Sequence, residues 1–257
     1  MSIKYFFNNT ILESMQGDMN FSSISSLFYF FKRDFCKFTL VLMLSIISLQ
    51  GLAQSDSLLQ AAQIETGIAK LETLKKLTYS TGNISEGVRY CRLLLAEAQK
   101  QNHIEYQSLA LAKIANWYYS QFDTDSFMIA FEPFEQFCHA QHFYKHYFIV
   151  VCNYVDRHCQ REKYALAMNK ANEAYELAKS INDAKSTAMA IKNIASVYEG
   201  MDQFPEAIEY TNRTLTLLKE MPQKDHLGLI DTYTSLSSYY SNLKQPNMVV
   251  AYADTIM

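Results

Sequence analysis

The chain has 257 residues, of which 49% are hydrophobic and 19% are charged. This composition can fill a sizeable core and is not that of a disordered chain. Only seven glycines and four prolines are present, which disfavours sandwiches, barrels and phosphate-binding glycine loops and favours helices. The net charge is −3 and no cluster of lysine or arginine stands out, so we expect no nucleic-acid surface in this chain.

The N-terminal segment has the order of residues found in a secretory signal. Basic side chains between residues 32 and 37 precede an apolar run, Phe38 to Leu49, and the small residues Gly51 and Ala53 follow it. The apolar run has twelve residues, whereas a membrane-spanning helix needs roughly 20. A buried core helix is the alternative interpretation of this run. We predict that residues 1–53 are a leader with a signal peptide, which would place the protein in the periplasm or cell envelope.

The remaining residues, 54–257, are predicted to form one helical repeat domain. The segment 193–217 resembles segments that begin forty, eighty and 120 residues earlier, and one that begins 42 residues later. Equivalent positions in the five units are Gly87, Phe127, Ala167, Ala207 and Val249. Each unit reads as two amphipathic helices joined by a short polar break, because its apolar residues follow the three-four spacing of one helical face.

The fourth unit resembles a tetratricopeptide repeat. Ile194, Ala195 and Tyr198 match the large, small and aromatic set of the first helix of that family, and Phe204 and Ala207 match the start of its second helix. The period of forty residues is longer than the usual period of about 34 and is also compatible with HEAT or armadillo repeats. The resemblance implies an all-α fold, a superhelical α-α solenoid of about five such helix pairs.

The second unit departs from the pattern. Phe127 stands where the first, third and fourth units have glycine or alanine, and Pro133 is expected to interrupt the second helix of this unit. The last helix is expected to begin at Pro246 and to leave Val249, Val250 and Tyr252 partly uncovered. This predicts either that a longer array continues the stack or that residues 246–257 form a homodimer contact.

The resemblance also implies a concave groove, lined by the first helices, that binds a peptide or protein segment. The candidate groove residues are His142, His146, Asn116, Asn153, Asp156 and Lys192. Asn116 and Asn153 could match two positions of the carboxylate clamp of the heat-shock adaptor subclass. Positions that should be basic in that clamp are Ala112, Met189 and Asn193, so the clamp is incomplete.

A stretch rich in histidine and cysteine could alternatively hold a metal. Residues 142–159 are expected to form the first helix of the third unit, with His142 and His146 four apart on one side. Two histidines at this spacing can bind one zinc ion, with Cys138 as a possible third ligand. A polar groove patch is the alternative, and His158 is interpreted as an aromatic substitute for the equivalent Tyr198.

The sequence contains none of the common catalytic or phosphate-binding motifs. We therefore expect a protein that is not an enzyme, has no catalytic residues and needs no cofactor. A signal followed by degenerate repeats resembles the exported part of bacterial signalling proteins, in which a kinase or DNA-binding domain follows. The alternatives are a stand-alone envelope scaffold and a metal-dependent enzyme that uses His142 and His146. Membrane tethering is expected only through the leader or through a part beyond Met257.

Overall fold

The computed structural model describes residues 55–223 and 225–256. The chain divides into two compact units, Met1–Ser57 and Leu58–Met257. The predicted leader, residues 1–53, lies outside the described residues. Within the described ranges no helix is long and apolar enough to cross a membrane.

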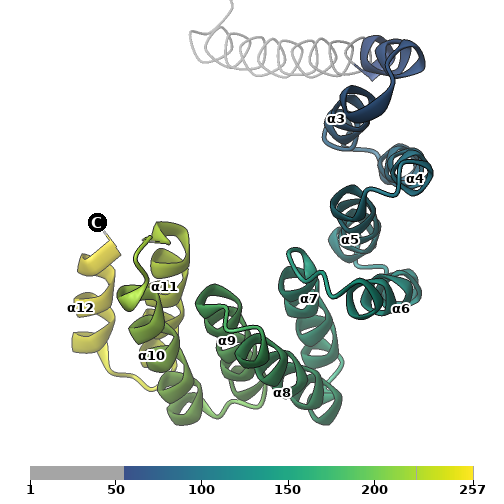
Figure 1. The fold of residues 1–257 in the computed structure, drawn as a ribbon. Helices are drawn as coiled ribbons and strands as arrows, with labels where there is room; N and C mark the ends of the chain where they lie inside the picture. The colour runs from purple at the N-terminus through teal and green to yellow at the C-terminus, as the bar shows by residue number, and fades with distance from the viewer. Residues whose placement is uncertain (1–54, 224, 257) are drawn as a thin grey trace, which may run out of the picture. The chain divides into compact units, whose positions relative to one another are not determined.

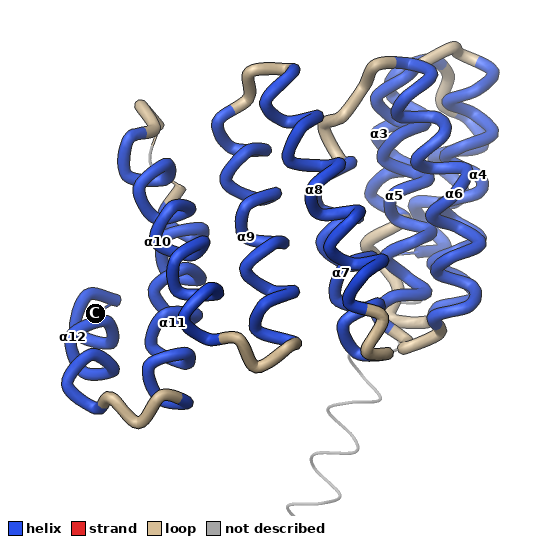
Figure 2. The backbone as a smooth tube through the Cα atoms, turned by 90° about the horizontal axis from the view of Figure 1, so that it is seen from below, coloured by secondary structure: helices blue, strands red, loops and turns tan. Residues whose placement is uncertain are grey.

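The second unit is all-α, as predicted, and its regular structure in the described residues consists of helices alone (Figure 2). Residues 55–64 are helical, and the helices that follow in chain order are α3 (Gly67–Leu77), α4 (Ile84–Lys100), α5 (Ile104–Ser120), α6 (Thr124–Gln141), α7 (Tyr147–Gln160), α8 (Tyr164–Ser180), α9 (Ala184–Gly200), α10 (Phe204–Glu220), α11 (His226–Asn242) and α12 (Pro246–Ile256). The helices from α3 to α12 correspond to the five predicted helix pairs, from α3 with α4 to α11 with α12.

The helices form two layers within this unit. Each helix packs against the next one in the chain, and α7 additionally packs against both α5 and α9. Figure 1 shows α5, α7 and α9 following one another along one side, with their partners α6, α8 and α10 on the other. We call α5, α7 and α9 the first-helix layer.

A repeated left-handed turn ends each helix from α4 to α9. Non-glycine residues with positive φ recur every twenty residues, at Asn102, Phe122, His142, Glu162, Asn182 and Asp202. After each of them a backbone N–H bonds back to the carbonyl five residues earlier, for example Lys163 N to His158 O at 2.8 Å. This is the Schellman arrangement that ends a helix, here built without glycine.

Small side chains set the close packing of the third and fourth pairs. The buried residues of α8 are Ala167, Ala171, Ala174 and Ala178, none of which is exposed to solvent. Ala207 of α10 is buried in the same way. Because alanine has no atoms beyond Cβ, neighbouring helix backbones can approach closely at these positions.

The expected interruption of the second unit at Pro133 is wrong. Helix α6 runs through Pro133 without a break, and Phe127, Phe131 and Phe134 on its inner face are buried. Pro133 itself is exposed. The backbone carbonyl that loses its partner belongs to Ile129, whose side chain is 75% exposed, so this acceptor lies on the solvent side of the helix.

The predicted start of the third unit's first helix is also wrong. Helix α7 begins at Tyr147 instead of His142, because His142 adopts φ 47° and ends α6. The residues between α6 and α7 do not continue either helix, and aromatic side chains pack against one another at this junction. Tyr144 and His139 lie against Tyr147, with ring centroids 5.8 and 5.4 Å away, and Tyr147 is fully buried.

The last helix is covered on one side only. Helix α12 packs against α11, and its residues Met248, Val249 and Tyr252 are half-buried while Val250 is 57% exposed. Partial exposure of this apolar surface agrees with the expectation from the sequence. The homodimer contact through residues 246–257 stays a prediction.

Candidate functional site

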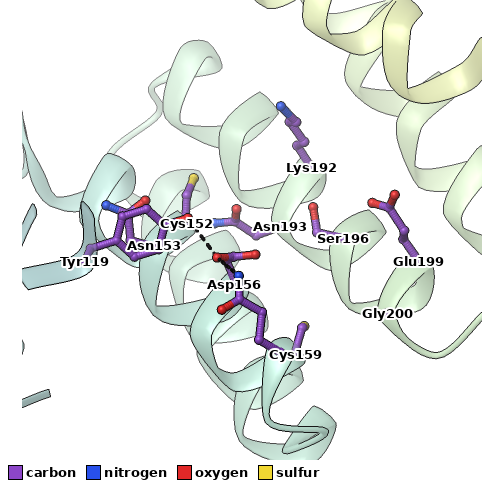
Figure 3. Close-up of a pocket in the computed structure, with 11 residues that line it drawn as sticks. Tyr119, Cys152, Asn153, Asp156, Cys159, Lys192, Asn193, Ser196, Glu199 and Gly200 are labelled. Carbon is purple, nitrogen blue, oxygen red and sulfur yellow. Dashed lines mark hydrogen bonds between the residues drawn. The ribbon is translucent and has the colours of Figure 1, made fainter. Parts of the chain in front are cut away.

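A pocket of about 530 Å³ opens on the first-helix layer (Figure 3). Helix α5 contributes Tyr119 to its wall. Helix α7 contributes Cys152, Asn153, Asp156, Cys159 and Gln160. Helix α9 contributes Lys192, Asn193, Ser196, Glu199 and Gly200. The pocket therefore lies where the resemblance places a peptide groove, on first helices of three successive pairs.

The pocket wall is built from repeated positions. Asn153 and Asn193 are forty residues apart and occupy the same place on α7 and α9. Asn116 and Asp156 are related in the same way on α5 and α7. One sequence period thus places a polar side chain on each successive helix of the layer.

Asp156 is fixed at the α5–α7 boundary. Its Oδ2 accepts hydrogen bonds from Tyr119 Oη at 2.7 Å and from Gln160 Nε2 at 2.8 Å. Burial raises the pKa of Tyr119 to about 12, and the hydrogen bond to the Asp156 carboxylate adds to the rise. The phenol therefore remains a hydrogen-bond donor at neutral pH.

A buried arginine supports this corner from behind. Arg157 is 3% exposed and donates to the backbone carbonyl of Tyr119 and, at 2.5 Å, to Gln160 Oε1. Its guanidinium also lies over the rings of Tyr119 and Phe122, at 4.3 and 4.7 Å from the centroids. Arg157 thereby holds in place two of the side chains that line the pocket.

Three further polar side chains of the site have partners on neighbouring helices. Asn153 Nδ2 donates to Asn116 Oδ1 at 2.8 Å, which joins α7 to α5. Lys192 forms an ion pair with Asp231 of α11. Glu199 Oε2 accepts from Tyr239 Oη at 3.0 Å, and burial with the nearby carboxylate raises the pKa of Tyr239.

Asn193 differs from these residues because its amide donor is unsatisfied. The side chain is 3% exposed, lines the pocket, and its Nδ2 has no hydrogen-bond partner in the described part of the chain. Its polar neighbour is the Cys152 thiol: burial raises the pKa of this thiol, and the Asn193 side chain opposes that rise. Because a thiol sulfur is only a weak acceptor, it does not replace an oxygen partner for the amide. A buried donor without a partner lowers the stability of the fold by roughly 1–3 kcal/mol. A ligand with a hydrogen-bond acceptor, placed in the pocket, would recover this free energy by binding to the Asn193 amide.

The structure brings together four of the six groove candidates. Asn153, Asp156 and Lys192 line the pocket, and Asn116 is bonded to Asn153. Sequence reasoning missed Tyr119 and Glu199, and it treated Asn193 only as a missing basic residue. The forty-residue relation between Asn153 and Asn193 was a signal that could have identified Asn193.

The two histidines of the proposed metal pair do not share a helical face. His142 is an exposed helix cap, whereas His146 is half-buried with Nδ1 3.1 Å from Ser108 Oγ of α5. Burial, together with nearby Lys145, lowers the pKa of His146. Burial raises the pKa of the Cys138 thiol to about 12, which disfavours the thiolate that a metal would require.

Glu135, His139 and Glu173 form the one group of three metal-ligating side chains close enough to share an ion among the described residues. A lysine already supplies positive charge there. Lys170 Nζ lies 2.9 Å from Glu135 Oε1 and 2.7 Å from Glu173 Oε2. The cluster is therefore an ion-pair network that connects α6 to α8.

The thiols in the pocket are not activated as nucleophiles. Burial raises the pKa of Cys159 to about 11 and shifts that of Cys152 in the same direction. All four described cysteines are free, and the thiol form dominates at neutral pH. What the pocket offers is hydrogen bonding and charge.

Comparison with known proteins supports the repeat fold. No protein-family model matches the chain, and no curated protein matches it in sequence. The crystal structure of BtubC (BKLC) from P. vanneervenii is similar over 82% of this chain and 89% of its own, with a TM-score of 0.64 and 16% identity.

Two other solved structures share the architecture. NprR in complex with its cognate peptide NprX matches 98% of this chain and 71% of its own, with a TM-score of 0.57 and 16% identity. A putative kinesin light chain of nearly identical TPR-like repeats from Podosopora anserina matches 72% of this chain and 90% of its own, with a TM-score of 0.50 and 12% identity. At these identities the likeness establishes the fold: the chain is an all-α protein of tetratricopeptide-like helical repeats.

Proposed function

We propose that the repeat unit is a non-catalytic binding module that holds an extended peptide segment across α5, α7 and α9. The observation that carries this proposal is the Asn193 amide, which is buried, lines the pocket and lacks a partner. A peptide carbonyl would satisfy it. Small-molecule catalysis has no comparable support, because the thiols beside it are held in their neutral form.

The spacing of the layer suits an extended chain. Neighbouring helices lie about 8–10 Å apart, which is the length of roughly three extended residues at about 3.3 Å each. Asn153 and Asn193 stand at equivalent places on α7 and α9, and an amide side chain can both donate to and accept from a peptide backbone. Asn153 and Asn193 can therefore hold the peptide backbone at two points one repeat apart, independently of the peptide's side chains.

The solved structure of NprR adds support, since that protein is in complex with its cognate peptide and has the same helical architecture. The likeness extends over almost the whole of this chain.

The proposal includes an exported location. The basic, apolar and small residues between 32 and 53 have the order of a secretory signal. On this proposal the module senses or recruits a protein segment in the cell envelope, as part of a signalling protein or as a stand-alone scaffold. N-terminal sequencing of protein from the envelope should find a start near residue 54, whereas a cytosolic protein that retains Phe38 to Leu49 would exclude export.

Peptide binding can be tested with a synthetic library of random nonapeptides that are acetylated and amidated. Peptides retained by the full chain are returned to it for hydrogen exchange. We expect slower amide exchange in α5, α7 and α9 and unchanged exchange in α6, α8 and α10. Protection confined to the second helices, or no retained peptide, would overturn the proposed function.

A further inference from the structure

We propose that the pocket between α7 and α9 selects peptides that carry a lysine or arginine side chain. This inference rests on the proposed function and specifies the chemistry of its ligand. Its basis is an excess of negative charge around the unsatisfied donor of Asn193.

Two carboxylates line the pocket without a cationic partner. Neither Asp156 nor Glu199 forms a salt bridge with any described residue, and each accepts hydrogen bonds only through one oxygen, from neutral donors. The second oxygen of each has no hydrogen bond in the same part of the chain. Figure 3 shows Asp156 and Asn193 pointing into the space between the two helices, with Glu199 farther along α9.

The nearby cations do not compensate this charge. Lys192 lines the pocket but is paired with Asp231, so that pair contributes little net charge. Arg157 is next to Asp156 in the chain, but it does not line the pocket and its guanidinium is directed to the Tyr119 carbonyl and Gln160. A ligand that enters the pocket therefore meets negative potential near Asp156.

The two features require different parts of one ligand. Asn193 Nδ2 can donate a hydrogen bond to a backbone carbonyl oxygen, which a peptide has at every residue. The Asp156 carboxylate favours a cation at the end of a flexible apolar stem, and Glu199 adds negative charge farther along α9. The half-buried thiols Cys152 and Cys159 line the same pocket and provide a weakly polar surface for that stem. An acidic peptide would place like charges together, which is the opposite of a carboxylate clamp.

The test compares the composition of peptides that the chain retains from the acetylated and amidated nonapeptide library. We expect lysine or arginine to be enriched at one position relative to the library, and aspartate and glutamate to be depleted there. Replacing that residue by norleucine should weaken binding at least about tenfold, since a charged hydrogen bond is removed.

Variants of the protein assign the preference to the pocket. Asp156→Asn combined with Glu199→Gln keeps the shape and the oxygen acceptors but removes both charges. It should abolish the enrichment of basic residues and bring the lysine and norleucine peptides to equal affinity. The matched control is Glu206→Gln with Glu209→Gln, which removes two exposed charges from α10 and should leave the preference intact.

The outcomes separate this inference from the function on which it rests. Retained peptides that protect α5, α7 and α9 but show no basic preference, or keep it in the Asp156→Asn, Glu199→Gln variant, would overturn this inference alone. If no peptide is retained, both the inference and the proposed function fail.

Discussion

Gly87 illustrates how one missing side chain can position a large neighbour. It is buried in α4, and a Cβ atom built on it would overlap the indole ring of Trp117 in α5. In an exposed helix interior the change from glycine to alanine is worth roughly 0.5–1 kcal/mol of added stability. Here the steric conflict should reverse that sign.

We predict that Gly87→Ala destabilises the repeat unit by about 1–3 kcal/mol, the usual cost of overpacking. Urea denaturation followed by circular dichroism gives the value. Gly82→Ala is the matched control, because nothing lies within 4 Å of the added atom. Equal or greater stability of Gly87→Ala would mean that Trp117 does not pack over this position.

His158 makes stability sensitive to pH. It is 7% exposed, is stacked 4.1 Å from the Tyr154 ring, and its Nδ1 lies 2.9 Å from the Tyr154 carbonyl. Burial lowers its pKa below the usual 6.5, although the carbonyl hydrogen bond partly opposes the shift. The unfolded chain therefore takes up the proton more readily than the folded chain when pH falls through about 6.5.

We predict that the urea midpoint of the protein falls between pH 7.5 and pH 5.5. The contribution of His158 is fully present above its unfolded pKa and is lost as pH falls below it. His158→Phe keeps an aromatic ring in the stack and should make the midpoint less dependent on pH. His142→Asn, at an exposed position, should keep the dependence of the unmodified chain; the same slope in all three proteins would contradict this assignment.

At the scale of the element, α6 shows that a helix can contain an internal proline at the cost of one backbone hydrogen bond. Pro133 lies on the solvent side of an 18-residue helix that stays continuous. Packing of Phe127, Phe131 and Phe134 on the opposite side outweighs the lost hydrogen bond, because these rings are almost completely buried. A helix whose inner side is buried this completely can stay continuous although one of its backbone hydrogen bonds is missing.

Pro133→Ala should therefore stabilise the protein, by up to roughly 3 kcal/mol, since the new N–H can bond to the Ile129 carbonyl. Slower amide exchange in residues 130–137 should accompany the gain. A lower urea midpoint would show that the packing of α6 requires a bend at this position.

The left-handed turns between helices are a second element-scale feature. Glu162 has φ 56° and is exposed, with no ion pair among the described residues. Glycine adopts this conformation without the penalty of about 1–2 kcal/mol that a Cβ atom brings.

We predict that Glu162→Gly raises stability by about 1 kcal/mol, whereas Glu162→Ala leaves it close to that of the unmodified chain. Thermal denaturation of the two variants side by side separates the backbone effect from loss of the side chain. If the alanine variant gained as much as the glycine variant, the benefit would come from removing the carboxylate and not from relief of the turn.

At the scale of the whole molecule, periodic features could be predicted and features without a period could not. The forty-residue repeat identified the helix pairs, and it placed Ala167 and Ala207 in the core, where they are completely buried. It also contained a signal for the end of α6 that sequence reasoning missed, because His142 lies forty residues from Asn102 and from Asn182, which end the equivalent helices. It failed at Pro133, since the exposed side of a helix tolerates a residue that the buried side would not.

The same distinction holds for the candidate site. Asn153, Asp156 and Lys192 were proposed from their positions on the first helices, and the structure gathers them in one pocket. The role of these residues in binding stays a prediction. Asn193 became prominent only when its burial and its missing partner were known, and both depend on tertiary contacts that a repeat pattern does not specify.

Asn193 allows the central claim, peptide binding in the pocket, to be tested directly. Replacing a residue that serves binding lowers peptide affinity without lowering stability, whereas replacing a residue that serves stability lowers the urea midpoint. Asn193→Leu removes a buried donor that has no partner and substitutes an apolar side chain of similar size. The urea midpoint should then rise or stay the same.

The decisive measurement is calorimetric titration of a library-selected nonapeptide into the full chain, Asn193→Leu and the surface control Glu209→Ala, together with the urea midpoint of each protein. We predict at least about a tenfold loss of peptide affinity in Asn193→Leu, with undiminished stability, and no change in Glu209→Ala. A destabilised Asn193→Leu that binds the peptide as tightly as the unmodified chain would contradict the account.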